Sequence, residues 1–210
     1  VSDGGRARPI GGPKQRTVLV HLILRANHVV PPERLIEQVW GADPPPAARS
    51  TLRGYVSHLR KALEPGRLDH RSGGYVLHAD PSSIDAVRFE VLVAEARAAD
   101  DPSAAARGFA SALELWRGPA LDDLADQPSL QPEIARLEEL RLAATEERLG
   151  AELDLGRHRE LIPELETLVA SHPYRERLCA NLMTALYYQG AKGGWQQFFA
   201  NLEQVLARTD

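Results

Sequence analysis

Apolar residues recur at helical spacing over most of the chain, and three such segments fall in its first third. The segments RTVLVHLIL, PPERLIEQVWG and AARSTLRGYVSHLRKAL each gather their apolar residues on one side of a helix. The second segment begins with prolines, which suit the first turn of a helix, and it stops at Gly41. The prolines at positions 44–46 then exclude a helix up to the third segment, because each lacks an N–H group and restricts the residue before it. We therefore expect three helices here, the third over residues 47–63.

A glycine-tipped hairpin is expected after the third helix. Pro65 and Gly66 stop the helical pattern, Gly73 and Gly74 suit a tight turn, and the following YVLH has the alternation and the side chains of a strand. Tyr75 is expected to anchor this hairpin in the core rather than to stack on a base. Three helices followed by a hairpin is the order of a winged helix-turn-helix domain, which we assign to residues 1–80. The glycine-rich residues 1–15 are interpreted as a loop or a weak hairpin.

The rest of the chain predicts helices almost throughout, after a polar linker at residues 80–83. Gly156 and Gly190 lie 34 residues apart, each between two predicted helices, and 34 residues is the tetratricopeptide period. The expected fold class is thus mainly α, a winged helix-turn-helix domain followed by an all-α tetratricopeptide-like domain over residues 81–210. Its expected helices cover residues 85–99, 103–116, 132–155, 159–171, 174–188 and 195–208.

The third predicted helix carries the strongest chemical signal. At about 100° per residue, Arg49, Arg53, Ser57 and Arg60 share one side of it, opposite the leucines. Residues 1–80 contain 12 Lys and Arg against 7 Asp and Glu, a net charge of +5, and 13 against 22 leave −9 for the remainder. Such an imbalance suggests a nucleic-acid module beside an acidic one. A merely solvated charged face would show the same helix pattern, and the basic hairpin favours DNA binding instead.

An arginine-bearing helix of this size fits the major groove of DNA, where arginine pairs with guanine. We expect the residues from Arg49 to Arg53 near base edges, Arg60 and Lys61 on the backbone, and the hairpin in or beside the minor groove. The start of the first helix is expected to add phosphate contacts. The expected DNA-binding residues are Lys14, Arg16, Arg49, Ser50, Thr51, Arg53, Ser57, Arg60, Lys61 and Arg71.

Patterns typical of enzymes and metal sites are absent from the sequence. The seven histidines show no paired spacing with each other or with Cys179, and the glycines before Lys14 do not have P-loop spacing. Asp122 and Asp123 are interpreted as helix caps rather than as catalytic acids. We therefore expect no catalytic activity, no cofactor and no metal. A single cysteine and the lack of an 18-residue apolar run favour a reducing, cytoplasmic setting and no membrane partner.

Several segments in this order carry a family resemblance. GGPKQRTVLVHLIL, ERLIEQVWG, TLRGYVSHLRKAL and GGYVL closely resemble the OmpR-type winged-helix domain of the Streptomyces antibiotic regulatory proteins. DAVRFEVLVAEAR, ALELWRGPALDDL and HPYRERLCANLMTALYYQG resemble the bacterial transcriptional activation domain that follows it in that family. The resemblance implies a transcriptional activator, acting on secondary-metabolite or related genes, that binds direct-repeat operators near promoters beside a second copy of itself.

The same resemblance implies that the loop between the second and third helices contacts RNA polymerase or its sigma factor. That loop comprises Gly41, Ala42, Asp43, Pro44, Pro45, Pro46, Ala47 and Ala48. Two departures from the family are expected to matter. The family's first strands have no counterpart before the glycine-rich start, so the sheet beside the winged helix should be incomplete, and the segment after Gly190 diverges.

Two other interpretations stay open at this point. In the first, the chain is a helical-repeat scaffold whose basic N-terminal region binds an acidic protein or remains solvated. In the second, which is compatible with DNA binding, it is the regulatory front of a larger ATPase or of a phosphopeptide-sensing regulator. No residue of the sequence decides the second.

Overall fold

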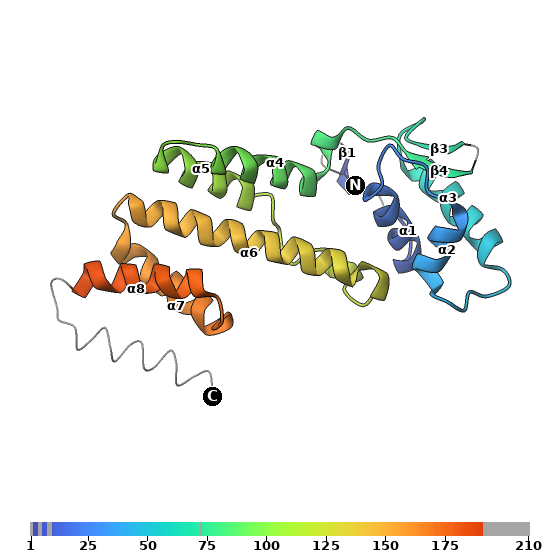
Figure 1. Ribbon diagram of the computed structural model, residues 1–210. Coiled ribbons are helices and arrows are strands. Elements are labelled where there is room, and N and C mark those ends of the chain that lie inside the picture. Colours follow the sequence, from blue (N-terminus) through green and yellow to red (C-terminus); the bar gives the residue numbers. More distant parts are fainter. Residues whose placement is uncertain (1, 4–5, 8–9, 72, 191–210) are drawn as a thin grey trace. The chain divides into compact units, whose positions relative to one another are not determined.

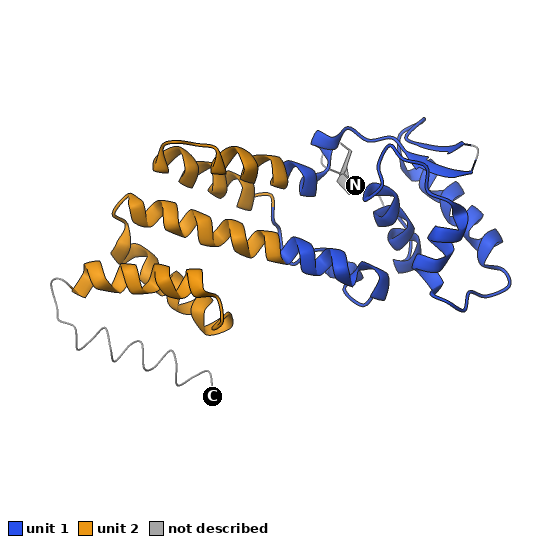
Figure 2. Ribbon diagram, in the orientation of Figure 1, with its two compact units in different colours: residues 1–88, 116–138 blue, residues 89–115, 139–210 orange. Residues whose placement is uncertain are grey.

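The computed structural model describes residues 2–3, 6–7, 10–71 and 73–190 (Figure 1). Contacts along the chain divide it into two compact units: unit 1, residues 1–88 with 116–138, and unit 2, residues 89–115 with 139–210 (Figure 2). The elements are the strands β1 (Ser2–Asp3), β2 (Arg6–Ala7), β3 (Leu68–Arg71) and β4 (Gly74–Leu77), the helices α1 (Pro13–Ile23), α2 (Pro32–Trp40), α3 (Ala48–Ala62), α4 (Asp85–Arg97), α5 (Pro102–Leu113), α6 (Gln131–Asp154), α7 (His158–Ser171) and α8 (Glu176–Gly190), and the short 3-10 helices η1 (Pro81–Ser83), η2 (Asp122–Leu124) and η3 (Pro128–Leu130).

Unit 1 contains the three expected helices around one apolar core. α1 and α2 each begin with a proline in the first turn, where the missing N–H group costs nothing. α3 turns Leu52, Val56 and Leu59 inward, and removing a leucine or valine side chain from water stabilises the fold by about 1.5–3 kcal/mol. The buried core is built mainly by Val18, Leu19, Leu22, Leu35, Val39, Leu52, Val56 and Leu59.

The hairpin that follows α3 is antiparallel and closes against the same core. β3 pairs with β4 in a register that sets His70 opposite Tyr75, and Tyr75 also exchanges two backbone hydrogen bonds with Val30, of 2.8 and 3.0 Å. A Cβ atom at position 74 would lie 2.2 Å from the carbonyl oxygen of Val30, so only glycine fits at Gly74. Tyr75 is 6% exposed, which confirms its expected place in the core.

A segment distant in sequence completes unit 1. Residues 116–138 pack on α1: Asp123 of η2 pairs with Arg16, and the Oγ atom of Ser129 lies 3.1 Å from Nε2 of His21. The expectation that Asp122 and Asp123 cap a helix was wrong. η2 has Leu121 at its N-cap and receives no side-chain cap, because the Asp123 carboxylate is directed to an arginine 107 residues away.

The described part of unit 2 is helical, and its apolar core lies among α6, α7 and α8. Leu149 and Leu165 are fully buried there, with Leu178 from α8. Gly108 of α5 lies so close to α4 that a Cβ atom would come within 2.8 Å of the Cβ atom of Ala96. The interior glycine therefore permits this close approach, at the expense of helix propensity.

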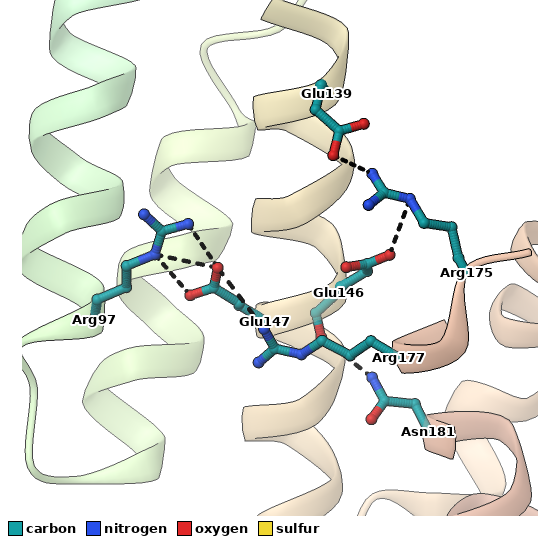
Figure 3. Close-up of polar contacts among 7 residues, drawn as sticks. All are labelled: Arg97, Glu139, Glu146, Glu147, Arg175, Arg177 and Asn181. Carbon is teal, nitrogen blue, oxygen red and sulfur yellow. Dashed lines mark hydrogen bonds and ion pairs between the residues drawn. The ribbon is translucent and has the colours of Figure 1, made fainter. Parts of the chain in front are cut away.

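Arginines also tie the helices of unit 2 together (Figure 3). Glu147 of α6 accepts hydrogen bonds of 2.6 and 2.9 Å from Arg97 of α4, and its Oε1 atom lies 3.9 Å from Arg177 of α8. Arg175 joins the α7–α8 connection to α6 by a 2.6 Å contact with Glu139 and a 3.5 Å contact with the buried Glu146. One acidic stretch of α6 thus receives cationic side chains from α4 and from the α8 region.

Some helix boundaries differ from those expected. α5 ends at Leu113, before Trp116, and α8 begins at Glu176, because Tyr174 lies in an exposed turn. The weak hairpin expected near the start is present as the pair β1 and β2. The helix expected over residues 195–208 lies outside the described residues. Within residues 2–190, as far as they are described, no helix has the length and apolar character needed to cross a membrane.

Candidate nucleic-acid interface

The two faces of α3 differ as the sequence predicts. Leu52 and Leu59 are fully buried and Val56 is 2% exposed. On the other side of the helix the side chains are polar or absent and face solvent. The exposed residues of α3 are Arg49, Ser50, Arg53, Gly54, Ser57, His58, Arg60 and Lys61. The helix therefore presents a basic surface about three turns long.

This basic surface has a centre and an edge. The helical spacing puts Ser50, Ser57 and Lys61 opposite the core, at the centre, and puts Arg53 and Arg60 on the side toward the hairpin. Arg60 donates a 2.9 Å hydrogen bond from Nε to the carbonyl oxygen of Leu68 in β3, which fixes its stem beside the hairpin. Thr51 is only half exposed, on the opposite side.

A cleft of about 310 Å³ separates this edge of α3 from the hairpin. Arg49 and Arg53 line it from α3, Glu33 from α2, and His70 from β3. Arg49 is ion-paired with Glu33, whose pKa is lowered by its backbone hydrogen bond and, to a smaller degree, by Arg49. Further lining residues are Pro32, Leu52, Gly73, Gly74 and Tyr75.

His70 was not among the residues expected from the sequence to bind DNA. The signal that would have found it is the hairpin register, which sets it opposite the buried Tyr75, with ring centroids 5.3 Å apart in an edge arrangement. Arg71, the expected hairpin residue, is exposed at the end of β3 next to the turn. The hairpin thus has two side chains, His70 and Arg71, that could contact a ligand bound to α3.

In the N-terminal turn of α1, Lys14 is exposed to solvent, whereas Arg16 is held in an ion pair within the protein. Lys14 is exposed, and its Nζ atom lies 5.5 Å from the centroid of the Trp40 ring. Arg16 forms the ion pair with Asp123, and its Nε atom is buried without a hydrogen-bond partner. Of the two, Lys14 is the one available to an anion outside the protein.

The loop between α2 and α3 is exposed from Gly41 to Ala47, and Gly41 adopts a positive φ of 75°. Ala48 differs from the expectation for this loop, because it is the first residue of α3 and is only 4% exposed. Any contact made by the loop therefore ends at Ala47.

His21, which contacts Ser129 of η3, should make the stability of the protein depend on pH. Burial, followed by the charges of Arg34 and Arg25, lowers the pKa of His21 from 6.5 to about 4. The unfolded chain then takes up a proton before the folded chain does, so stability is full above about pH 6.5 and falls as the pH drops toward about 4. A His21→Gln variant should lose less of its melting temperature between those pH values. An equally steep loss in the variant, followed by circular dichroism, would contradict this assignment.

Comparison with known proteins identifies the family. Residues 84–209 match the bacterial transcriptional activator domain, and residues 9–77 match the family described as transcriptional regulatory protein, C terminal. The chain is 37% identical over 218 residues to the regulatory protein DnrI of Streptomyces peucetius, covering 97% of this chain and 80% of DnrI. The chain is a member of the Streptomyces antibiotic regulatory protein family. Its fold class, a winged helix followed by a helical activator domain, is confirmed by the same matches and by the structure.

Other members and neighbours of the Streptomyces antibiotic regulatory protein family are longer. The regulatory protein AfsR of Streptomyces griseus is 40% identical over 200 residues, which cover 94% of this chain and 20% of AfsR. The solved structure of Mycobacterium tuberculosis EmbR in complex with a low-affinity phosphopeptide has a TM-score of 0.85 and 34% identity, covering 96% of this chain and 55% of that one. AfsR and DnrI are named regulatory proteins and EmbR a transcriptional regulatory protein, and the family matches of this chain are a regulatory and an activator domain.

Proposed function

We propose that this chain is a sequence-specific DNA-binding activator that binds direct-repeat operators near promoters and recruits RNA polymerase. The observation that supports this best is the exposed basic surface of α3 beside a glycine-tipped hairpin. In this proposal α3 enters the major groove, with Ser50 and Ser57 facing the base edges. The base-reading role expected of Arg49 and Arg53 stays a prediction, and both lie nearer to the hairpin than to the centre of the helix face.

Phosphate contacts surround this helix in the proposal. Lys61 lies at the C-terminal end of the exposed face, Lys14 at the start of α1, and Arg71 next to the hairpin turn. Phosphate contacts set the register of the protein on the duplex, whereas base contacts select the sequence. Arg71 would approach the minor groove or its flanking phosphates. Arg16 would need to leave Asp123 to join them.

The loop Gly41–Ala47 is proposed to contact RNA polymerase or its sigma factor. It is exposed throughout, and its three consecutive prolines restrict the backbone, so little conformational entropy is lost on binding. A second copy bound to the adjacent repeat would double the contacts with the polymerase.

We further propose that the protein acts on the chromosome, and therefore in the cytoplasm. The family suggests secondary-metabolite genes as its targets. The boundary near residue 80 between a DNA-binding and an activation domain is kept as part of this proposal.

Because AfsR and EmbR are longer than this chain, a regulatory extension is a compatible proposal. The scaffold alternative is different in kind. It predicts that duplex binding is no tighter than for any basic protein and vanishes at physiological salt. A gel shift with a promoter fragment carrying direct repeats, against a shuffled fragment of equal length, separates the two. Retention of the repeat fragment alone at physiological salt supports the activator, and equal or no retention of both fragments contradicts it.

One proposed phosphate contact predicts a change in salt dependence. Replacing Lys61 with alanine should weaken binding to repeat and shuffled duplexes by the same factor, because a phosphate contact carries no sequence information. The slope of log affinity against log salt should become shallower by about 0.9. Fluorescence anisotropy titrations at several salt concentrations measure both. Glu95→Ala in α4, a change at an exposed acidic position of unit 2, is the control and should leave the slope unchanged.

A further inference from the structure

The cleft between α3 and the hairpin lies where a DNA backbone must run if α3 occupies the major groove and the hairpin the minor groove. A phosphate strand separates the two grooves of a duplex, so a protein that enters both grooves straddles one strand. The cleft is about 310 Å³ in volume, and α3, the hairpin and the start of α2 line it. Under the proposed function, the duplex strand between the two grooves would thus run past this cleft.

The charges that line the cleft are unequally compensated. Arg49 is neutralised by Glu33, with which it forms an ion pair. Arg53 lines the same cleft, and among the described residues no carboxylate pairs with it. His70 faces it from β3, exposed to solvent and held at its ring by Tyr75. The side chains open to an incoming anion are therefore Arg53 and His70.

We propose that this cleft is a seat for one backbone phosphodiester, held by His70 from the hairpin and by Arg53 from α3, which then contacts phosphate in place of the base edge expected from the sequence. The proposal rests on the proposed DNA-binding function and adds a residue and a chemistry to it. Arginine donates N–H groups to phosphate at any pH, and imidazole donates one N–H group when neutral and carries a full charge once it is protonated. Because a phosphate favours the charged form of an imidazole beside it, a seat that includes His70 predicts tighter duplex binding at lower pH.

Apart from His70, the charged side chains that line the cleft are Arg49, Arg53 and Glu33. Glu33 has a lowered pKa and remains an anion. On β3 itself, Asp69 is directed away to His78, at 3.3 Å. His70 is the one imidazole among the residues that line the cleft.

The test is a fluorescence anisotropy titration of a labelled random-sequence duplex, which needs no knowledge of the operator. It compares the whole wild-type chain with His70→Gln at about pH 6 and about pH 8, over a series of salt concentrations. We expect His70→Gln to weaken binding more at the lower pH and to make the salt slope there shallower by about 0.9. Arg53→Ala should make the slope shallower by the same amount at both pH values. The His70→Lys variant should show, at both pH values, the salt slope that the wild type shows at the lower pH.

Matched controls separate the seat from general effects. His28 is also exposed, lies outside the cleft and hydrogen-bonds to the carbonyl oxygen of Ala26. The His28→Gln variant should therefore bind the duplex with the wild-type affinity and salt slope at both pH values. A His70→Gln variant with the wild-type pH and salt dependence would overturn the proposal, as would an equal shift in His28→Gln. An unchanged salt slope in Arg53→Ala would also overturn it. A wild-type chain that binds no duplex at all would instead refute the proposed function, and a circular dichroism melt confirms that each variant is folded.

Discussion

Replacing Leu52 with alanine should lower the free energy of unfolding of unit 1 by about 2–5 kcal/mol, the range for large-to-small changes in a tightly packed core. Leu52 is fully buried and packs in the core that joins α3 to α1, α2 and the hairpin. The cavity left behind cannot collapse easily, because rigid elements surround the site from several directions. Urea denaturation followed by far-UV circular dichroism measures the loss.

Ser50→Ala provides the control on the same helix. Ser50 is exposed, and its hydroxyl donates a 2.8 Å hydrogen bond to the carbonyl oxygen of Ala47, so only about 0.5–1 kcal/mol is expected from its removal. If Leu52→Ala cost no more than Ser50→Ala, the assignment of the inward face of α3 would be wrong. If it abolished duplex binding without loss of stability, Leu52 would have a role that its burial does not explain.

Hydrophobic periodicity was sufficient to predict the three helices α1, α2 and α3 of unit 1. The proline at the start of α2 and the three prolines after Gly41 marked the ends of elements, because proline acts on its own backbone wherever the chain goes. The glycines of the hairpin turn acted in the same way. The exposed basic face of α3 followed from the same pattern, since a helix that buries its leucines must turn the opposite side outward.

Long-range pairing was what periodicity did not reveal. Asp123 was expected to cap a helix, as an aspartate near the start of a helix often does, and instead it pairs with Arg16 across 107 residues. The packing of residues 116–138 on α1 has no local sequence signal, because it depends on where the intervening helices bring the chain. For His70 the hairpin register was a local signal, since it sets His70 opposite Tyr75, but the neighbours of His70 from α2 and α3 have no such signal.

Replacing Ser57 with glutamate should have the largest effect on DNA binding. Ser57 is exposed at the centre of the α3 face, where the duplex would lie closest, and a carboxylate there would meet phosphates and base acceptors without water between them. We expect affinity for any duplex to fall by at least about tenfold, the equivalent of about 1.4 kcal/mol. The fold should be unaffected, because the side chain contacts solvent.

The most direct test of the account is therefore an anisotropy titration of one duplex with three proteins: the wild type, Ser57→Glu, and Ser111→Glu in α5. The two variants carry the same added charge, and Ser111 is likewise exposed but lies in unit 2. If the exposed face of α3 enters the duplex, Ser57→Glu loses at least about tenfold in affinity, while Ser111→Glu binds within about twofold of the wild type. Equal affinities for the two variants would show that this face of α3 does not meet DNA.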